Sequence, residues 1–438
     1  MQALATIKYK GDPLSKTGEG NTLISDISLR FLFFAIIGVI ILIKIMSWQF
    51  LDDHLFFGTY SLLITVYILS RFLLAYFHLS IPVNKKYTPT ISFVIPAKNE
   101  GDNIAKTLFE CIKSDYPLDK MEVIAINDGS TDNTHEEMLR AKYETGNKIE
   151  RFEVVDWKVN KGKREGMAAG VKMARGEIIV FVDSDSFIEK DCVRHLVKYF
   201  QNAEIGAVSG HTDVHDPQHN MLTRMQAVRY YISFKIYKAA ESVFGLVTCC
   251  PGCCSAYRKS YLDEFIDEWL DQKFLGKKCT FGDDRSLTNY IIRKYKSVYC
   301  EEARAVTVVP DNFAQYKKQQ QRWKKSWVRE TLIASTFMWK KNPIAAFFFY
   351  VYAFLAFTSP VVFVRAVVWH PYTTHELPIV YFLGLFMMLL LHGIYYRIEV
   401  GEKRWFSAIV AFWGNTVALI WQLPWAIVTI SDTKWGTR

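Results

Sequence analysis

Several features that would assign this chain to other protein classes are missing from its 438 residues. Its 53 Lys and Arg residues are interspersed with 44 Asp and Glu residues, and no basic stripe lacks acidic neighbours, which argues against nucleic-acid binding. Disordered tracts and fibrous repeats are also missing. The first 30 residues contain no short apolar centre with a small-residue cleavage site, so we expect no secretory signal and a cytosolic N-terminus.

Cysteine is sparse, with eight residues that all fall between positions 111 and 300. We expect this part of the chain to be cytosolic, so the thiols should be reduced. Four of them lie in the sequence CCPGCC at residues 249–254. No further Cys or His follows at the spacing of a zinc knuckle, so a packed loop is favoured over a metal site.

Apolar and aromatic residues are abundant. The chain is 50% hydrophobic and 15% aromatic, with a mean hydropathy of +0.05, which is too apolar for an ordinary soluble enzyme. Four apolar runs have about the length that crosses a bilayer, and they cover residues 31–46, 55–77, 344–369 and 378–396. Within each pair of runs the connector lacks Lys and Arg, whereas basic residues follow the pair. Both pairs are therefore predicted to start and end in the cytosol.

The last apolar run, residues 405–430, allows two interpretations. Basic residues on both sides, together with interruptions at Gly414 and Pro424, indicate a re-entrant hairpin that returns to the cytosol. A single tilted span is the alternative. Arg71, near the end of its own apolar run, is expected to extend its charge to the lipid headgroups.

The segment between the apolar runs predicts a cytosolic domain with its own core. Short β-rich runs alternate there with helical patterns. Strands are expected at residues 91–95, 122–126, 152–155 and 178–182, and helices at residues 102–113, 134–143 and 163–175. This alternation is typical of a mostly parallel sheet with helices on both faces, in which ligands bind at the carboxyl ends of the strands.

Polar segments follow three of the predicted strands, at residues 96–100, 127–130 and 183–186. Asp183 and Asp185 would place two carboxylates on one side of an extended segment, which suits a divalent cation bound to phosphate. A strand-end Asp pair is as often a turn device, but the acidic turn at 127–130 favours the metal interpretation. The next helix opens with residues 161–164, whose cations and backbone N–H groups suit a diphosphate.

Two later segments complete a candidate site. Residues 281–285 (FGDDR) supply a second acidic pair, and residues 319–323 (QQQRW) supply a cation beside an indole. If the latter segment is helical, Gln319, Arg322 and Trp323 share one face. A carboxylate base, a metal-bound leaving diphosphate, a cation and an indole for a sugar are the parts of a transferase that uses a nucleotide-activated sugar. An interfacial membrane anchor is the alternative for the Arg-Trp pair.

In this order, the motifs resemble those of the processive membrane glycosyltransferases of family 2. The resemblance rests on Val94-Ile-Pro96, Asn127-Asp-Gly-Ser-Thr-Asp132, Asp183-Ser-Asp185, Gly282-Asp-Asp-Arg285 and Gln319-x-x-Arg-Trp323. It covers essentially the whole chain. It implies an α/β cytosolic domain of the GT-A type, with a mostly parallel, Rossmann-like sheet, embedded between α-helical transmembrane segments.

Further segments resemble particular subfamilies. Residues 272–289 and the Trp-Gly-Thr-Arg sequence at 435–438 resemble the hyaluronan synthases. Residues 307–311 and 249–258 instead resemble the chitooligosaccharide synthases of nodulating bacteria. The first resemblance implies a processive, inverting synthase that uses UDP-GlcNAc with UDP-GlcUA, and the second implies UDP-GlcNAc alone. A non-catalytic polysaccharide export component is an alternative from another class, but the acidic motifs that it could lose are present.

The resemblance also implies a domain organisation and a location. The expected parts are a cytosolic segment (1–30), two transmembrane helices (31–79), a cytosolic GT-A-like domain (88–312), amphipathic interface helices with the QxxRW motif (313–341) and a C-terminal transmembrane region (342–438). The protein would be a multi-pass plasma-membrane protein with its catalytic domain in the cytoplasm. Its partners would be UDP-sugars, the growing polysaccharide and membrane lipids. Residues 221–240 would form another interface helix, or else a solvated helix of the domain.

Roles for single residues follow from the same resemblance. Asp284 would be the catalytic base, which takes a proton from the acceptor hydroxyl, and Asp185 would coordinate Mg²⁺ or Mn²⁺. The substrate-binding residues would be Pro96, Glu100, Asp128, Lys163, Asp183, Gly252, Cys279, Asp283, Arg285, Gln319, Arg322 and Trp323.

Within this set, Asp128 and Asp183 would contact the uridine and the ribose. Lys163 with Arg322 would bind the diphosphate, and Trp323 would stack under the acceptor sugar. One segment departs from the family pattern, because residues 251–254 read Pro-Gly-Cys-Cys where Ser-Gly-Pro or Cys-Gly-Pro is expected. This loop is expected to face the acceptor, so the departure leaves the identity of the acceptor open.

Overall fold

The computed structural model describes residues 22–47, 55–401 and 405–431. The chain divides into two compact units. One comprises residues 1–65 with 358–420, and the other comprises residues 66–357 with 421–438. The larger unit contains the sheet and all of the predicted site residues.

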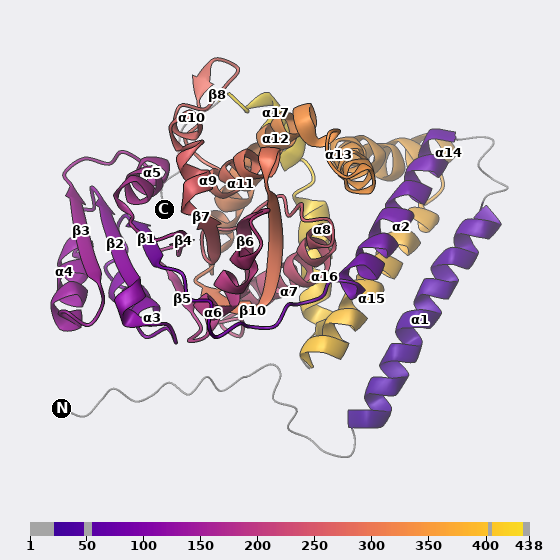
Figure 1. Ribbon diagram of the computed structural model, residues 1–438. Coiled ribbons are helices and arrows are strands. Elements are labelled where there is room, and N and C mark those ends of the chain that lie inside the picture. The colour runs from indigo at the N-terminus through magenta and orange to yellow at the C-terminus, as the bar shows by residue number, and fades with distance from the viewer. Residues whose placement is uncertain (1–21, 48–54, 402–404, 432–438) are drawn as a thin grey trace. The chain divides into compact units, whose positions relative to one another are not determined.

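The larger unit is built on an eight-stranded sheet (Figure 1). Its strands are β1 (Ile91–Ala97), β2 (Met121–Asp128), β3 (Arg151–Trp157), β4 (Ile178–Phe181), β5 (Ser186–Ile188), β6 (Ile205–Val214), β7 (Ser255–Arg258) and β10 (Lys296–Thr307). Their order is β3-β2-β1-β4-β7-β6-β10-β5. The pairs among β1, β2, β3 and β4 are parallel, as is β6 with β10, whereas β7 and β5 run antiparallel to their neighbours. A separate hairpin joins β8 (Lys273–Phe274) and β9 (Lys277–Lys278).

Helices cover both faces of this sheet. They are α3 (Ile104–Ile112), α4 (Thr134–Thr145), α5 (Lys163–Met173), α6 (Cys192–Val197), α7 (Met221–Ile232), α8 (Ala239–Ser242), α9 (Lys259–Asp263), α10 (Ile266–Leu270), α11 (Asp283–Lys294) and α12 (Phe313–Met338). Alternate residues of β1 enter different cores, since side chains alternate along a strand. Phe93 and Ile95 pack with α3, α4 and α6 on one face, and Val94 packs with α5, α10 and α11 on the other. A Cβ at Gly170 of α5 would lie 2.2 Å from a methyl carbon of Val94, so glycine permits this close approach.

This architecture confirms the fold that the sequence predicts. The predicted strands at residues 91–95, 122–126, 152–155 and 178–182 correspond to the first four strands, and the three predicted helices correspond to α3, α4 and α5. The ends differ by a few residues, as helix and strand boundaries commonly do.

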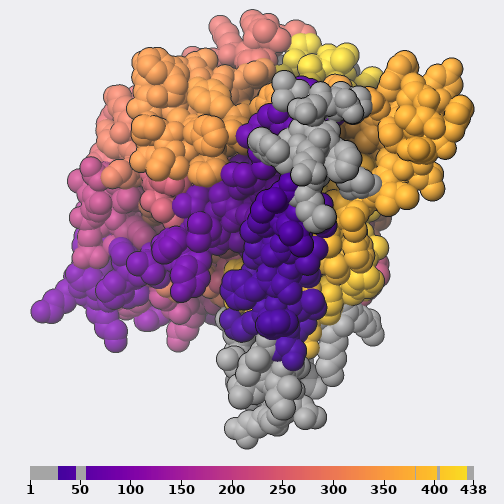
Figure 2. Space-filling view, turned by 90° about the vertical axis from the view of Figure 1, so that its right-hand side faces the viewer, coloured from indigo at the N-terminus to yellow at the C-terminus, as the bar shows by residue number. Residues whose placement is uncertain are grey.

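The long apolar runs are helical. In the described residues they are carried by α1 (Thr22–Ser47), α2 (Leu55–Tyr76), α13 (Pro343–Val364), α14 (His370–Thr374), α15 (Ile379–Val400), α16 (Trp405–Ala418) and α17 (Gln422–Val428). Four stretches of the described residues are long and apolar enough to cross a membrane, namely Ser28–Ile45, Phe56–Tyr76, Pro343–Thr374 and Tyr381–Val400. In the smaller unit α1 packs against α15, and Figure 2 shows α1 in indigo. Phe31 and Phe34 on α1 are 76% and 69% exposed, which suits a lipid-facing helix.

The third predicted span, residues 344–369, lies within the candidate span Pro343–Thr374. Its helix continues past residue 369, because a π-helical turn (Arg365–Trp369) leads directly into α14. Pro371 is tolerated there because it lies in the first turn of α14. Arg71 does not extend to the headgroups. Its side chain is 3% exposed, and its guanidinium lies 4.1 Å from the ring centroid of Phe348 and 4.9 Å from that of Tyr67.

The last apolar run is broken rather than straight. Helices α16 and α17 (Gln422–Val428) are bent by 42° at a short break, which fits either a broken span or a re-entrant loop. Pro424 explains the break. Proline has no N–H group to donate, and its ring clashes with the carbonyl four residues earlier, here that of Ile420, so the helix is interrupted just before it. In the larger unit α17 packs on α12, where the side chain of Gln422 donates to the carbonyl of Lys317 at 3.2 Å.

Candidate active site

Three charged side chains from distant segments meet around Gly252. A Cβ on Gly252 would lie 2.7 Å from Asp183 Oδ1, 3.0 Å from Asp284 Oδ1 and 3.1 Å from Lys163 Nζ. Lys163 Nζ donates to Asp183 Oδ1 at 2.5 Å. We call these four residues the charged cluster. It joins the start of α5, the turn after β4, the loop before β7 and the start of α11, and a Cβ at position 252 would force these charged groups to shift.

The carboxylate of Asp284 has the properties of a proton acceptor. Its Oδ1 is buried and has no hydrogen-bond partner among the described residues. Burial raises the pKa of Asp284 to about 6, with Asp183 and Asp283 adding to the rise, while Lys163 and the backbone N–H of Gly252 oppose it. A buried oxygen without a donor can accept a hydrogen bond from a substrate hydroxyl. A carboxyl with this pKa is largely ionised at neutral pH. Its pKa also lies close to neutral pH, which suits a general base.

Lys163 stays positively charged in this cluster. Burial alone would lower its pKa, but the carboxylates of Asp183 and Asp284 raise the pKa above its ordinary value. A partly buried ammonium beside two carboxylates is a fixed cation at the carboxyl end of the sheet. It can bind an anionic leaving group there, as the sequence predicts.

Asp128 fixes the loop that leads to Lys163. Its Oδ1 accepts from the backbone N–H of Lys161 at 2.6 Å, and its Oδ2 accepts from that of Gly162 at 2.9 Å. Gly129 has φ of +64°, and a Cβ there would lie 2.5 Å from the backbone nitrogen of Asn160. The two loops therefore approach each other closely at a position that favours glycine. The predicted contact of Asp128 with uridine remains a prediction.

The Asp183-Ser-Asp185 segment is a turn, so the expectation of an extended segment is wrong. The backbone N–H of Ser186 donates to the carbonyl of Asp183 at 3.0 Å, which reverses the chain between the two acidic residues. Asp183 pairs with Lys163, whereas Asp185 is 7% exposed, with the hydroxyls of Ser186 and Thr307 each 3.5 Å from its Oδ1. Mg²⁺ and Mn²⁺ favour such oxygen donors, and Mg²⁺ is commonly held by one or two carboxylates together with substrate phosphates, so Asp185 fits a cation of this kind.

Another group has the spacing of metal ligands. In the described part of the chain, the one set of three such residues whose ligand atoms lie within 4.8 Å of one another is His195, Cys300 and Glu302. Lys198 lies among them, with its Nζ 3.3 Å from Glu302 Oε2 and 3.5 Å from His195 Nδ1. Because this ammonium already supplies the positive charge, the group is explained as a partly buried ion pair.

The QxxRW segment is helical, as predicted. Asn312 caps α12 by accepting from the backbone N–H of Gln315 at 3.0 Å. Gln319, Arg322 and Trp323 therefore share one face of α12. The indole of Trp323 is half-buried, and the guanidinium of Arg229 on α7 lies 5.4 Å from its ring centroid. Helix α7 thus holds the indole in place through a cation–π contact.

Tyr230 is a site residue that the sequence analysis missed. Its ring centroid lies 6.5 Å from that of Trp323. Burial raises the pKa of its phenol, and Cys253, Asp185 and Asp183 act on it in the same direction. Tyr230 therefore lies near the indole and close enough to the acidic groups to feel their charge. The mixed basic and aromatic sequence of residues 221–240 suggested an interface or a solvated helix, but Val228, Ile232 and Ile236 are buried in this domain.

Other predicted residues have partners of their own. Arg164 Nε donates to Asp283 Oδ1 at 2.8 Å, and the side chain of Asp283 is 3% exposed. Cys279 is buried, and its backbone N–H donates to the carbonyl of Gln272 at 3.0 Å. Arg285 donates to the hydroxyl of Thr248 at 3.4 Å.

Pro96 and Glu100 follow β1. A Cβ on Gly166 of α5 would lie 2.9 Å from Pro96 Cβ, so this proline packs under the helix that starts at Lys163. Glu100 is 8% exposed and accepts from the side chain of Asn103 at 3.1 Å. The roles predicted for all of these residues in substrate binding remain predictions.

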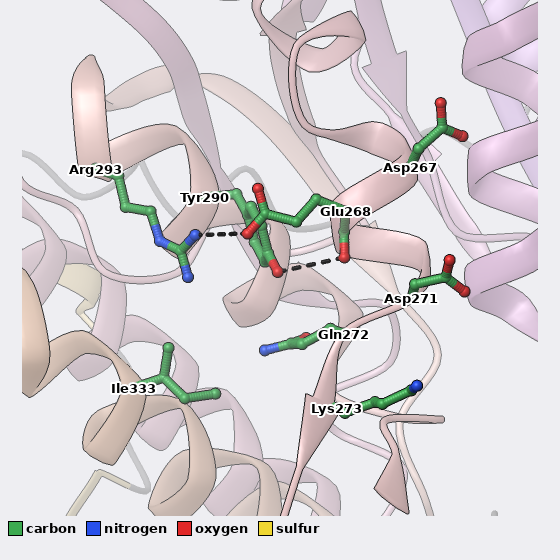
Figure 3. Close-up of a pocket in the computed structure, with 8 residues that line it drawn as sticks. All are labelled: Asp267, Glu268, Asp271, Gln272, Lys273, Tyr290, Arg293 and Ile333. Atoms are coloured by element: carbon green, nitrogen blue, oxygen red, sulfur yellow. Dashed lines mark hydrogen bonds and ion pairs between the residues drawn. The ribbon is translucent and has the colours of Figure 1, made fainter. Parts of the chain in front are cut away.

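Figure 3 shows a cavity elsewhere in this unit, with a volume of about 510 Å³. It is lined by Asp267, Glu268, Asp271, Gln272, Lys273, Tyr290, Arg293 and Ile333. Glu268 and Arg293 form an ion pair at 3.1 Å in its wall. No residue of the charged cluster lines it.

Part of the chain matches a known protein family. Residues 92–266 match the family model described as glycosyl transferase family 2. The chain is similar to hyaluronan synthase from Streptococcus pyogenes, with 29% identity over 385 residues that cover 87% of this chain and 90% of that protein. It is also similar to an N-acetylglucosaminyltransferase from Azorhizobium caulinodans, with 32% identity over 56% of this chain and 62% of that protein.

The fold is similar to a solved structure. Mannosyltransferase PcManGT from Pyrobaculum calidifontis, in complex with GDP-Man and Mn²⁺, matches with a TM-score of 0.62 and 20% identity. The match covers 86% of this chain and 99% of that chain. Residues 92–266 thus form a family 2 glycosyltransferase domain with a GT-A-like fold, and the protein is a glycosyltransferase.

Proposed function

We propose that this protein is a processive, inverting synthase that builds a β-linked polysaccharide from UDP-sugars and passes it through the membrane. The observation that carries the proposal is the charged cluster, in which an oxygen of Asp284 that has no partner within the described ranges lies beside the ammonium of Lys163. Similarity to the hyaluronan synthase over 90% of that protein supports a polysaccharide product. Four candidate spans in the same chain support its export.

The donor would lie along the carboxyl ends of β1, β2 and β4. Asp128 and Asp183 would contact the uridine and the ribose, and Lys163 with Arg322 would bind the diphosphate oxygens. Asp185 would hold Mg²⁺ or Mn²⁺ against the same oxygens, and the cation would neutralise charge on the leaving diphosphate. The solved mannosyltransferase with bound Mn²⁺ and GDP-Man supports a nucleotide-sugar donor and a divalent cation in this fold.

Transfer would be a single displacement. The acceptor hydroxyl donates to Asp284 Oδ1 and gives up its proton as its oxygen bonds to the anomeric carbon of the donor. The bond from that carbon to the diphosphate breaks on the opposite face, and UDP leaves with the electron pair. Configuration inverts, so an α-linked donor gives a β-linkage. Asp284 then returns its proton to solvent.

The acceptor would stack on Trp323. The cation–π contact with Arg229 and the neighbouring ring of Tyr230 support this role, because they hold the indole in place. Stacking positions the acceptor hydroxyl without contacting the donor, so it contributes through orientation. The catalytic domain would face the cytoplasm, where UDP-sugars are made, with the spans in the plasma membrane.

Hyaluronan-type and chitin-type synthesis differ in the donors that they require. The hyaluronan synthase match covers more of this chain, and the shorter match to the N-acetylglucosaminyltransferase supports transfer of N-acetylglucosamine. We favour the hyaluronan type, with a chitin or chitooligosaccharide synthase as the alternative. The departure from the family pattern at residues 251–254 includes Gly252 of the charged cluster, so the identity of the acceptor stays open.

The test is polymer synthesis by the purified full-length protein in detergent or nanodiscs. Mg²⁺ or Mn²⁺ is supplied with UDP-GlcNAc alone, UDP-GlcUA alone, or both. Product that requires both donors and is degraded by hyaluronidase supports the hyaluronan type. Product from UDP-GlcNAc alone that chitinase degrades supports the alternative, and no product with any of these donors contradicts the proposal.

A further inference from the structure

Arg164 is buried beside the charged cluster but turns away from it. Its side chain is 4% exposed, although residues 161–164 look like a diphosphate-binding segment in the sequence. Its Nε donates to Asp283 Oδ1 at 2.8 Å. Its Nη1 donates to the carbonyl of Trp269 at 3.2 Å and to Gln272 Oε1 at 3.0 Å. Its guanidinium also stacks 4.7 Å from the ring centroid of Trp269, so this arginine is fixed from several sides.

Gln272 extends this arrangement in two directions. Its Oε1 accepts from the hydroxyl of Ser286, one turn along α11 from Asp283, at 2.5 Å. Its Nε2 lies 3.4 Å from Oε1 of Glu330, a residue of α12 that is completely buried. Gln272 also lines the cavity in Figure 3.

Glu330 fixes α12 to α11. It pairs with Arg329 at 2.7 Å and accepts from the side chain of Asn289 at 3.0 Å. The guanidinium of Arg329 donates to the carbonyl of Phe281, just before Gly282. A Cβ on Gly282 would lie 1.9 Å from the hydroxyl oxygen of Ser326, so α12 packs directly on the start of α11.

We propose that Arg164 is a positioning residue, which holds the carboxylate of Asp283 so that Asp284 is aimed into the charged cluster while α12 is held in register. The two acidic residues are neighbours at the start of a helix, so fixing one side chain fixes the direction of the other. The network connects the residue after Lys163, the residue before Asp284 and the helix that bears Trp323. This inference rests on the proposed role of Asp284 as the base.

Charge neutralisation alone is a simpler role for Arg164, and the geometry distinguishes the two. A lysine could neutralise Asp283, but its single ammonium cannot reproduce the planar fork that bonds Asp283, Gln272 and the Trp269 carbonyl. Replacing both Arg164 and Asp283 with apolar residues would leave no unpaired charge, but the start of α11 would lose the hydrogen bonds that hold it. The positioning role therefore predicts reduced turnover both with lysine at position 164 and in the double replacement. Charge neutralisation alone predicts turnover close to wild type in both.

The experiment measures turnover and UDP affinity of the full-length protein in detergent. Turnover is UDP release with the donors that support wild-type synthesis, and UDP affinity is measured by titration calorimetry. Arg164→Lys and the double variant Arg164→Met/Asp283→Leu should each lose about 100-fold in turnover, as expected for a misplacement of ~1 Å, with UDP affinity within about three-fold of wild type. Arg151→Met is the matched control.

Arg151 forms a comparable pair with Glu122, at 3.1 Å with side chains 19% and 4% exposed, at the other end of the strands. Its replacement should leave turnover unchanged. Turnover within three-fold of wild type in Arg164→Lys or in the double variant would overturn the proposal, as would a parallel loss of UDP affinity. If Asp284→Asn in the same series keeps turnover, it is the base assignment that fails; if Asp284→Asn is inactive and Arg164→Lys is active, only the positioning role fails.

Discussion

Two groups of charges lie side by side in the sequence and behave differently in the structure. In the charged cluster, the side chains of Lys163 and Asp183 are 25% and 26% exposed, and an oxygen of Asp284 lacks a partner among the described residues. In the neighbouring network, Arg164 and Asp283 are 4% and 3% exposed. Successive residues at the start of α5 and of α11 thus contribute to different groups.

The difference teaches how a reactive group is supported. The network uses most of its hydrogen-bonding groups internally, although Arg164 Nη2 and Trp269 Nε1 are buried without a partner among the described residues. In the cluster a carboxylate oxygen lacks a partner within the same described part of the chain and lies beside a cation, which is the arrangement that the proposed proton transfer needs. The structure therefore separates the acidic pair that the sequence presents as one motif.

Asp284→Asn should have the largest effect. The amide cannot accept the acceptor's proton, so sugar transfer should fall by about 1,000-fold while UDP still binds. Radiolabelled polymer synthesis and UDP titration give both quantities, with Asp263→Asn, an exposed position on α9, as the control. Substantial polymer synthesis by Asp284→Asn would remove this residue from the role of base.

Gly252→Ala should come next, because it places a methyl group inside the charged cluster. The new Cβ would lie 2.7 Å from Asp183 Oδ1 and 3.0 Å from Asp284 Oδ1, so these carboxylates must shift. We expect a loss of about 100-fold in turnover. The matched control is Gly384→Ala, which meets no atom within 4 Å. Equal activity of the two variants would show that the cluster is loosely packed.

Trp323→Ala should lose elongation by about ten-fold or more while hydrolysis of the UDP-sugar changes little. The indole positions the acceptor and does not contact the donor in the proposed mechanism. Product length on gels, measured beside UDP release, separates the two effects. If elongation is unchanged, the indole is only a membrane anchor.

The pH dependence should follow the ionisation of Asp284. The base must be deprotonated, and burial raises its pKa to about 6, so turnover per donor bound should rise with pH through that value. Between pH 7.5 and pH 5 we expect a fall of about ten-fold, since about one carboxyl in ten stays ionised one unit below its pKa. A flat profile across this range would contradict the assignment of the base.

Glu330→Gln changes a residue of the supporting network and leaves the charged cluster intact, so we expect the smallest effect on turnover. The amide keeps the shape but leaves the guanidinium of Arg329 without its buried counter-charge. We expect the free energy of unfolding to fall by about 1–3 kcal/mol, and turnover to fall only a few-fold. Thermal unfolding in detergent checks this, and an unchanged midpoint would show that this pair contributes little.

Much of the fold could be predicted, because its signals are local. Alternating β-rich runs and helical patterns give the parallel half of the sheet, and length with apolarity gives the membrane helices. The antiparallel strand β7 was not predicted, since its short sequence carries no periodicity that distinguishes it. The turn at Asp183 was missed because turns and extended strand ends share the same residue types.

The site could be predicted only in part. Motif order brought Lys163, Asp183 and Asp284 together correctly, since they follow strands or begin helices at one edge of the sheet. The sequence could not show which of two adjacent residues faces the cluster, because that depends on the start of each helix and on partners far along the chain. Tyr230 was missed for the same reason, as its neighbours Trp323 and Asp185 are distant in sequence.

The most direct test of the separation between the two groups is a comparison of Asp283→Asn with Asp284→Asn in one preparation. Turnover and UDP affinity are measured for both. The account predicts that Asp284→Asn is inactive, and that Asp283→Asn keeps UDP affinity within about three-fold and a reduced but measurable turnover. Loss of UDP affinity in Asp283→Asn would show that Asp283 binds the donor, and would contradict the assignment of this residue to the supporting network.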